Sequence, residues 1–256
     1  MAAPGDIPLL AALPDRDLRR EGLVVAEGRL VTERLLSSPD FVPLIVACVP
    51  ALAPAFEIRA GGRCPVRVLA ERDIAAIAGF PFHRGVLAVA SRPPPLSAAR
   101  LFAEGRGPRR VLLLPSTSDP ENMGALIRSA SAFGFETLIL GPASCDPLSR
   151  RSLRVSMGAA LSIRTAILEG PSELASLRRG GLVIAAAVLD PAALSLREWA
   201  LPPRLALAIG NEYSGLEAMW LAEADVFVRI PMEAGPDSLN AAAAGAVLMY
   251  ETSRRG

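Results

Sequence analysis

The sequence contains no lysine, and all 27 of its basic residues are arginine. A chain without lysine cannot form a lysine Schiff base, and it cannot supply the lysine of a nucleotide-binding P-loop. Its single histidine, His83, excludes metal sites built from several histidines and leaves one residue at most for a histidine-based triad. The composition therefore removes several common enzyme classes before any motif is considered.

Cysteine is also scarce, and its three copies are scattered singly at Cys48, Cys64 and Cys145. This spacing predicts neither a disulfide framework nor a zinc site. The longest uncharged apolar run near the start, Val42 to Phe56, contains three prolines and is too short to cross a bilayer. The first residues, MAAPGDIPLLAALPDRD, have no basic leader before the apolar ones, so no secretory signal is expected. We therefore expect no membrane partner and a location in the reducing cytoplasm.

The chain is rich in apolar residues, which a folded core can bury. Hydrophobic residues make up 51% of its 256 residues and the mean hydropathy is +0.36, which excludes global disorder. The net charge of +1 gives no general attraction for nucleic acid, so local arginine patches would have to bind RNA. A proline run at Ser91 to Pro95 marks a connector. We expect an N-terminal domain at 1–92, a linker at 93–109 and a second domain at 110–256.

Both domains alternate short apolar runs with helical stretches, which predicts an α/β fold. In the first domain we expect strands at Leu23–Ala26, Leu44–Val49, Val66–Leu69 and Gly85–Ala90, with helices at Arg29–Leu36 and Glu71–Ala78. In the second we expect strands at Val111–Leu114, Thr137–Leu140, Val183–Val188, Leu205–Ile209 and Val226–Ile230, and a last helix at Leu239–Glu251. Near-continuous apolar strands separated by helices indicate a parallel sheet covered on both faces.

The first motif of the second domain is DPENMGALIR, from Asp119 to Arg128. Asp119 is a good N-cap, and Pro120 suits the first helical position. Asn122 and Arg128 are six positions apart, nearly two helical turns, so they cannot both lie in one core-facing stripe without a polar partner. A buried arginine would need an anion or an acid beside it. The alternative is a surface arginine on an amphipathic helix.

The second motif, LALAIGNEYSG, leads from a buried strand into a turn that contains Gly210, Glu212 and Gly215. Ligands of open α/β sheets bind beyond the carboxyl ends of strands, so Gly210 and Glu212 are candidate site residues. Glycine there permits a close approach of backbone to ligand. The alternative is an ordinary strand-to-helix turn.

The third motif is VRIPM at 228–232, followed by Ser238-Leu239-Asn240 before the alanine-rich last helix. Ser238 could be an N-cap. We do not expect capping to explain Asn240, because asparagine is a poor interior helix former. A helix start that faces a strand end offers free backbone N–H groups to a ligand.

Together and in this order, the three motifs resemble the SpoU/TrmH family of RNA ribose 2′-O-methyltransferases, part of the SPOUT superfamily. The resemblance extends from Val111 to Glu251. It rests on N-x-G-x-x-x-R ending at Arg128, on G-x-E-x-x-G beginning at Gly210, and on I-P-M…S-L-N ending at Asn240. The first domain, with LVVAEG at 23–28 and HRGVLAV at 83–89, is similar to the RNA-binding substrate domain that many members carry.

The resemblance implies a parallel sheet with a deep trefoil knot, a homodimer, S-adenosyl-L-methionine as cofactor and no metal. It implies cofactor contacts at Leu140, Gly141, Ile209, Gly210, Ile230 and Leu239. It implies catalytic roles for Arg128, Asn122, Glu212, Ser238 and Asn240. Arg128 would either accept the hydroxyl proton with the help of an RNA phosphate or clamp that phosphate and stabilise the alkoxide. RNA contacts are expected from the arginines at 106, 109, 110, 150, 151 and 154.

The function expected from the resemblance is S-adenosylmethionine-dependent methylation of a ribose 2′-hydroxyl, in ribosomal RNA in preference to transfer RNA. A tRNA 2′-O-methyltransferase and a non-catalytic RNA-binding protein that retains the fold are the alternatives. A dinucleotide-binding Rossmann enzyme is rejected, because the turn after Leu114 lacks G-x-G-x-x-G.

Overall fold

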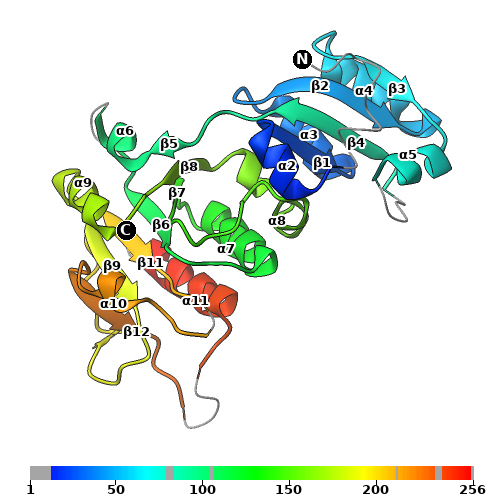
Figure 1. Cartoon of the computed structure of the whole chain (residues 1–256). Helices are drawn as coiled ribbons and strands as arrows, with labels where there is room; N and C mark the ends of the chain where they lie inside the picture. The colour runs from blue at the N-terminus through cyan, green and yellow to red at the C-terminus, as the bar shows by residue number, and fades with distance from the viewer. Residues whose placement is uncertain (1–12, 79–83, 104–106, 212, 234–237, 255–256) are drawn as a thin grey trace. The chain divides into compact units, whose positions relative to one another are not determined.

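A computed structural model of the chain describes residues 13–78, 84–103, 107–211, 213–233 and 238–254. The chain divides into two compact units (Figure 1). Unit 1 comprises residues 1–94 and 147–162, and unit 2 comprises residues 95–146 and 163–256. In the described ranges, no helix is both long and apolar enough to cross a membrane.

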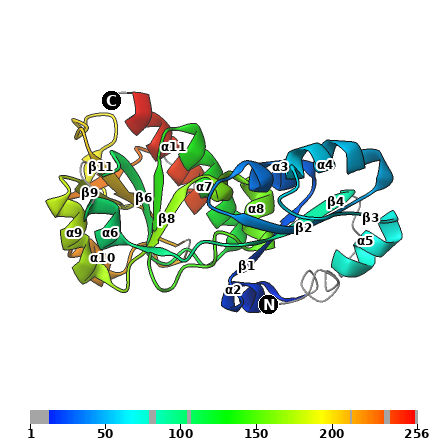
Figure 2. The same ribbon diagram turned by 90° about the horizontal axis from the view of Figure 1, so that it is seen from above.

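Unit 1 is built on a four-stranded sheet in the order β1-β4-β2-β3. Strands β1 and β2 run antiparallel to β4, and β3 runs parallel to β2. Helices α2 and α5 pack on one face and α3 and α4 on the other (Figure 2). The elements are α2 (Asp15–Arg20), β1 (Leu23–Glu27), α3 (Arg29–Ser37), β2 (Val42–Cys48), α4 (Ala53–Ala60), β3 (Val66–Val68), α5 (Glu71–Ala78), β4 (Val86–Ser91) and α8 (Arg150–Val155).

Helix α8 follows the third strand of unit 2 in the chain, and polar contacts hold it within unit 1. Nη2 of Arg150 donates a hydrogen bond to the carbonyl of Leu13 at 3.1 Å. Glu27, at the end of β1, is only 4% exposed. Its carboxylate lies 3.6 Å from Nε of Arg150 and 3.8 Å from Nη1 of Arg154. Burial raises the pKa of Glu27 above the usual glutamate value, and the two arginines oppose the rise.

Unit 2 contains an eight-stranded sheet in the order β10-β12-β9-β11-β6-β7-β8-β5, and all of its strand pairs are parallel. Helices α6, α9 and α10 cover one face, and α7 and α11 cover the other (Figure 2). The elements are β5 (Leu96–Ser97), α6 (Ala98–Ala103), β6 (Arg110–Leu114), α7 (Pro120–Ala132), β7 (Thr137–Leu140), β8 (Arg164–Ile167), α9 (Leu174–Arg179), β9 (Val183–Ala187), β10 (Leu194–Ser195), β11 (Leu205–Ala208), α10 (Ala218–Leu221), β12 (Val226–Arg229) and α11 (Ala241–Arg254). The predicted α/β class and parallel sheet are confirmed.

The central strands are apolar on both faces, as the sequence predicts. In β6, Val111 and Leu113 join the core under α6, α9 and α10. Leu112 and Leu114 point to the opposite face because side chains alternate along a strand, and both are fully buried. A strand that is buried on both faces needs apolar side chains at every position, so its apolar run is continuous.

One helix boundary and three strands of the second domain differ from expectation. The last helix begins at Ala241 and extends to Arg254, so Leu239 and Asn240 lie before it. Strand β8 was not expected, because it is short and begins with Arg164 and Thr165. Strands β5 and β10 were not expected either, since each has two residues at an edge of the sheet.

Candidate functional site

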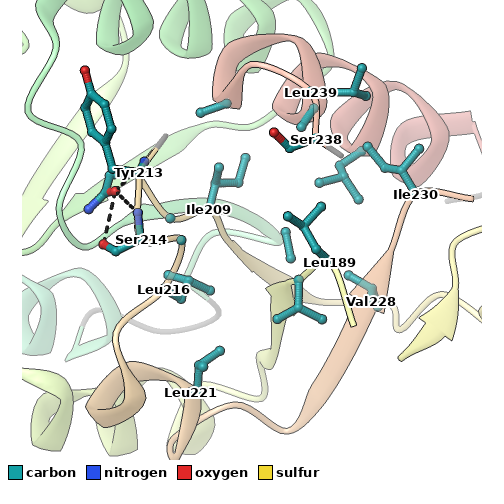
Figure 3. Close-up of a pocket in the computed structure, with 18 of the residues that line it drawn as sticks. Leu189, Ile209, Tyr213, Ser214, Leu216, Leu221, Val228, Ile230, Ser238 and Leu239 are labelled. Carbon is teal, nitrogen blue, oxygen red and sulfur yellow. Dashed lines mark hydrogen bonds between the residues drawn. The ribbon is translucent and has the colours of Figure 1, made fainter. Parts of the chain in front are cut away.

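A cavity of about 440 Å³ lies beyond the carboxyl ends of β9, β11 and β12, beside the start of α11 (Figure 3). Small-molecule sites typically enclose about 300–1,000 Å³, and parallel sheets bind ligands at this edge. None of its described lining side chains carries a charge, and most are aliphatic. The lining comprises Ala187, Val188, Leu189, Ile209, Gly210, Asn211, Tyr213, Ser214, Gly215, Leu216, Leu221, Val228, Ile230, Met232, Ser238, Leu239, Ala241, Ala244 and Leu248.

Four of the six expected cofactor residues line this cavity. Ile209 and Gly210 follow β11, Ile230 follows β12, and Leu239 precedes α11. The other two, Leu140 and Gly141, lie at the end of β7 and are not among the lining residues. The fold thus brings together residues from the second and third motifs that are up to 30 positions apart in the chain.

The turn after β11 closes tightly on itself. A Cβ atom added to Gly210 would collide with the backbone of Gly215 and Leu216, so only glycine fits there. Asn211 and Gly215 exchange two backbone hydrogen bonds of 3.1 Å. The side-chain oxygen Oδ1 of Asn211 accepts from the backbone N–H of Tyr213 at 2.9 Å. Glu212, an expected catalytic residue on this turn, lies outside the described residues, as does His83.

The first and third motifs meet through their asparagines. Oδ1 of Asp119 accepts from the backbone N–H of Glu121 at 2.9 Å and caps α7, as predicted. The other carboxylate oxygen of Asp119 accepts from Nδ2 of Asn122 at 3.3 Å. Oδ1 of the buried Asn122 in turn accepts from Nδ2 of Asn240 at 3.1 Å. Asp119 therefore fixes the orientation of the Asn122 amide, and Asn122 in turn holds the side chain of Asn240.

The expectation that capping does not explain Asn240 is wrong. Because α11 begins at Ala241, Asn240 is its N-cap, and its Oδ1 accepts from the backbone N–H groups of Ala242 at 2.9 Å and Ala243 at 3.3 Å. Its Nδ2 remains available for Asn122. Ser238 lies further from the helix start, is exposed and lines the cavity. The asparagine therefore serves both the helix and the site.

Of the two alternatives for Arg128, a buried arginine beside an anion and a surface arginine, the structure shows the surface arginine. It is exposed on α7, whereas Asn122 on the same helix is buried. Among the described residues it forms no hydrogen bond or ion pair, and it does not line the cavity. An exposed guanidinium of this kind is free to bind an external anion.

Two residues with a role at the site were not singled out from the sequence. Asn211 braces the turn, and asparagine after glycine is a recognisable turn signal. Gly245 lies inside α11, where an added Cβ would collide with Leu126 of α7 and lie 2.9 Å from Cδ1 of Ile209. A glycine inside a helix often marks such close packing.

The arginines expected to bind RNA differ in their surroundings. Arg106 lies outside the described residues, and Arg109 is exposed. Arg110 is half-buried at the start of β6, where burial lowers its pKa. Arg150 and Arg154 lie against Glu27 inside unit 1. Two of the six expected arginines therefore already have a buried acid as their partner.

Comparison with known proteins identifies the family. Residues 109–250 match the SpoU rRNA Methylase family. Over 241 residues the chain is 39% identical to a Mycobacterium tuberculosis protein named as an uncharacterized tRNA/rRNA methyltransferase, covering 92% of this chain and 82% of that one. It is 28% identical over 224 residues to the Bacillus subtilis 23S rRNA (guanosine(2553)-2′-O)-methyltransferase RlmP, covering 88% and 86%.

A solved structure has the same fold. The SpoU methyltransferase AviRb from Streptomyces viridochromogenes, in complex with AdoMet, superposes with a TM-score of 0.81 at 23% identity, and the match covers 100% of this chain and 98% of that one. The eight-stranded parallel sheet therefore has the same fold as the sheet of that structure. The chain belongs to the SpoU rRNA methylase family.

Proposed function

We propose that this protein transfers the methyl group of S-adenosylmethionine to a ribose 2′-hydroxyl of ribosomal RNA. Family membership supports the reaction class, and the name of the relative RlmP supports the ribose and the ribosomal substrate. The observation that carries the proposal is the cavity itself. It gathers the glycine turn after β11, the segment after β12 and the start of α11, which are the segments that hold the second and third family motifs.

The lining fits S-adenosylmethionine. Aliphatic side chains such as Ile209, Ile230 and Leu239 would hold the adenine ring, and the turn from Gly210 to Gly215 would offer backbone groups to its polar edge. Bound there, the cofactor supplies a methyl group on a positively charged sulfur. The AdoMet complex of AviRb, a protein of the same fold, supports this choice.

The chain's own residues would align the ribose and handle its proton. The 2′-oxygen would form its bond to the methyl carbon as the carbon–sulfur bond breaks, and the hydroxyl proton would pass to an RNA phosphate or to water. Such a displacement needs accurate positioning above all. The Asn122–Asn240 pair would orient the sugar, and exposed Arg128 would clamp an RNA phosphate and stabilise the developing alkoxide. We favour the clamp over a proton-accepting role because a guanidinium does not readily lose a proton.

We further propose that unit 1 binds RNA, that the segment carrying α11 is threaded as a trefoil knot, and that the protein acts in the cytoplasm. Its three cysteines are free thiols, which suits a reducing compartment.

We also propose a homodimer formed through α11. Val247 and Tyr250 are 42% and 48% exposed on this helix, although both are large and apolar. Val247→Arg should convert the dimer to a monomer in size-exclusion chromatography with light scattering, whereas wild type that is already monomeric would contradict the proposal.

The function is tested with two assays. Titration calorimetry with S-adenosylmethionine measures cofactor binding, and tritiated-methyl transfer to total RNA from cells lacking the protein measures activity. We expect binding and label in the ribosomal fraction, at a ribose that becomes resistant to alkaline cleavage. Label in transfer RNA would identify the alternative substrate, and binding without transfer would identify a non-catalytic RNA-binding protein.

A further inference from the structure

Tyr213 is an aromatic side chain with almost no intramolecular contact. It is 97% exposed, although it lies on the turn that lines the cavity. Figure 3 shows its ring directed away from the apolar lining formed by residues such as Ile209 and Leu216. Aromatic residues form only 5% of this sequence, and it has two tyrosines. A ring left in water adds nothing to folding stability, so the whole aromatic face of Tyr213 is available to a partner.

Hydrogen bonds to Asn211 brace the described part of the turn that carries Tyr213. Oδ1 of Asn211 accepts from the backbone N–H groups of Tyr213 and Ser214 at 2.9 and 2.8 Å, and from the hydroxyl of Ser214 at 3.2 Å. The paired backbone bonds between Asn211 and Gly215 close the base of the turn. These contacts use the backbone of Tyr213 and leave its ring unconstrained. The turn would therefore form with another residue at this position, and the ring is not needed to build it.

The same turn is connected to the first motif. Nδ2 of Asn211 donates to the hydroxyl of Ser116 at 3.4 Å. Ser116 lies in the loop between β6 and α7, three residues before Asp119, which caps α7 and binds Asn122. The ring of Tyr213 is thus presented from a braced turn shared by the cavity and the helix that carries Arg128.

The chemistry available to such a ring on RNA is stacking. Unpaired bases stack on exposed aromatic side chains, and every base offers a face for this contact. We propose that Tyr213 is a stacking platform for an unpaired nucleobase of the substrate RNA, at or next to the nucleotide whose ribose is methylated. This inference rests on the proposed function. Tyr213 is then a substrate-positioning residue, and this role depends on its aromatic ring and not on its hydroxyl.

The direct test replaces only the ring. We compare wild type with Tyr213→Phe, which keeps an aromatic face, and Tyr213→Leu, which keeps an apolar side chain without one. Binding of short fluorescein-labelled oligoadenylate and oligouridylate at low salt is followed by anisotropy. Tyr213→Phe should bind both as wild type does. Tyr213→Leu should bind both about tenfold more weakly, which is the effect expected from the loss of one stacking contact. The loss should be larger for oligoadenylate, because a purine has the larger face.

A second variant reports stacking without any need for turnover. In Tyr213→Trp, the new indole should be quenched when oligoadenylate binds. The native tryptophans, Trp199 and Trp220, are only 6% and 5% exposed, so wild type should show little quenching and serves as the control. Binding of S-adenosylmethionine, measured by calorimetry, shows that each variant retains its fold.

The outcomes separate this inference from the proposed function. Equal RNA affinity of wild type and Tyr213→Leu, or an unquenched Tyr213→Trp complex, would overturn the stacking role. A dimer-to-monomer change in Tyr213→Leu, seen by light scattering, would overturn it as well and would assign the ring to a contact between subunits. Failure of wild type to methylate RNA while the quenching persists would overturn the proposed function alone.

Discussion

Nδ2 of Asn240 donates a 3.1 Å hydrogen bond to Oδ1 of Asn122, although 118 positions separate the two residues. Asn122 lies on α7, early in unit 2, and Asn240 lies at the start of α11, the last helix. This bond therefore connects two segments of unit 2 that are far apart in the sequence. Asp119 fixes which end of the Asn122 amide faces Asn240, because its carboxylate can only accept. The orientation of both site amides is therefore set by one cap of α7.

The two roles of Asn240 can be separated by substitution. Asn240→Asp keeps an oxygen that caps α11 but loses the N–H donated to Asn122. Aspartate caps helices about as well as asparagine, but its carboxylate would face the buried acceptor Oδ1 of Asn122, so the free energy of unfolding should fall by about 1–3 kcal/mol. Methyl transfer should fall on the order of a hundredfold, since misplaced reacting groups cost that much. Urea unfolding and the tritiated-methyl assay measure the two effects.

Asn240→Ala is the matched comparison, because it removes both roles. It should lower the free energy of unfolding by about 1 kcal/mol, the usual cost of a lost cap, and should be as inactive as Asn240→Asp. An Asn240→Asp protein with full activity would show that the bond to Asn122 has no part in the reaction.

Arg128→Ala should abolish activity without affecting the fold. The side chain is exposed and has no intramolecular partner among the described residues, so unfolding should change by less than about 0.5 kcal/mol. Methyl transfer should fall on the order of a thousandfold if the guanidinium stabilises the alkoxide. S-adenosylmethionine affinity should be retained, because Arg128 does not line the cavity. Calorimetry and the methyl assay provide these measurements.

Arg179→Ala is the control for charge loss, since its side chain is exposed at the end of α9, on the face of the sheet opposite α7. It should be fully active. Arg128→Lys keeps the charge but loses the paired donors of the guanidinium, and it should have intermediate activity. Full activity of Arg128→Ala would mean that another group handles the ribose oxygen.

The sheet was predictable because its central strands leave a strong pattern. Thr137–Leu140 matches β7 at both ends, and Val111–Leu114 misses only the first residue of β6. Buried parallel strands need uninterrupted apolar residues, and few other structures do. Short strands such as β5 and β10 have no such requirement, since each pairs over two residues at an edge.

Part of the lining of the candidate site was predictable, and the connections between its residues were less so. The motifs identify Gly210, Ile230 and Leu239, and the fold brings them to one cavity. The role of Asn240 was misjudged because helix ends depend on local geometry that propensity does not resolve to one residue. Its bond to Asn122 joins distant segments, and no local pattern in a single sequence encodes such a pairing.

Gly210→Ala should weaken S-adenosylmethionine binding. The added methyl group would collide with the backbone of Gly215 and Leu216, which cannot move aside without opening the turn. Overpacking of this kind costs about 1–3 kcal/mol, and we expect the dissociation constant to rise on the order of tenfold or more. Calorimetry measures the change directly.

The matched control is Gly170→Ala in the same unit. A Cβ there meets no atom within 4 Å, and its backbone is extended, so alanine fits without strain. Binding by Gly170→Ala should equal that of wild type. Unaltered binding by Gly210→Ala would show that this turn does not contact the cofactor.

Glu27 should make the stability of unit 1 depend on pH. Burial raises the pKa of this carboxyl in the folded protein above its ordinary value of 4.5, with Arg150 and Arg154 opposing the rise. The folded state therefore binds the proton more tightly than the unfolded state does. The stabilisation this provides is complete below the unfolded pKa and is lost as the pH rises through the folded pKa. Glutamine has nearly the same shape and does not ionise, so Glu27→Gln removes this dependence alone.

We therefore expect the free energy of unfolding of wild type, relative to Glu27→Gln, to decrease as the pH rises from the acid side of 4.5 toward neutrality. Urea unfolding of both proteins across that range gives the difference at each pH, and effects of other groups cancel. The opposite trend, with wild type gaining on the variant as the pH rises, would mean that attraction to Arg150 and Arg154 outweighs desolvation. In that case the 3.6 and 3.8 Å contacts stabilise the charged carboxylate and with it the attachment of α8 to β1.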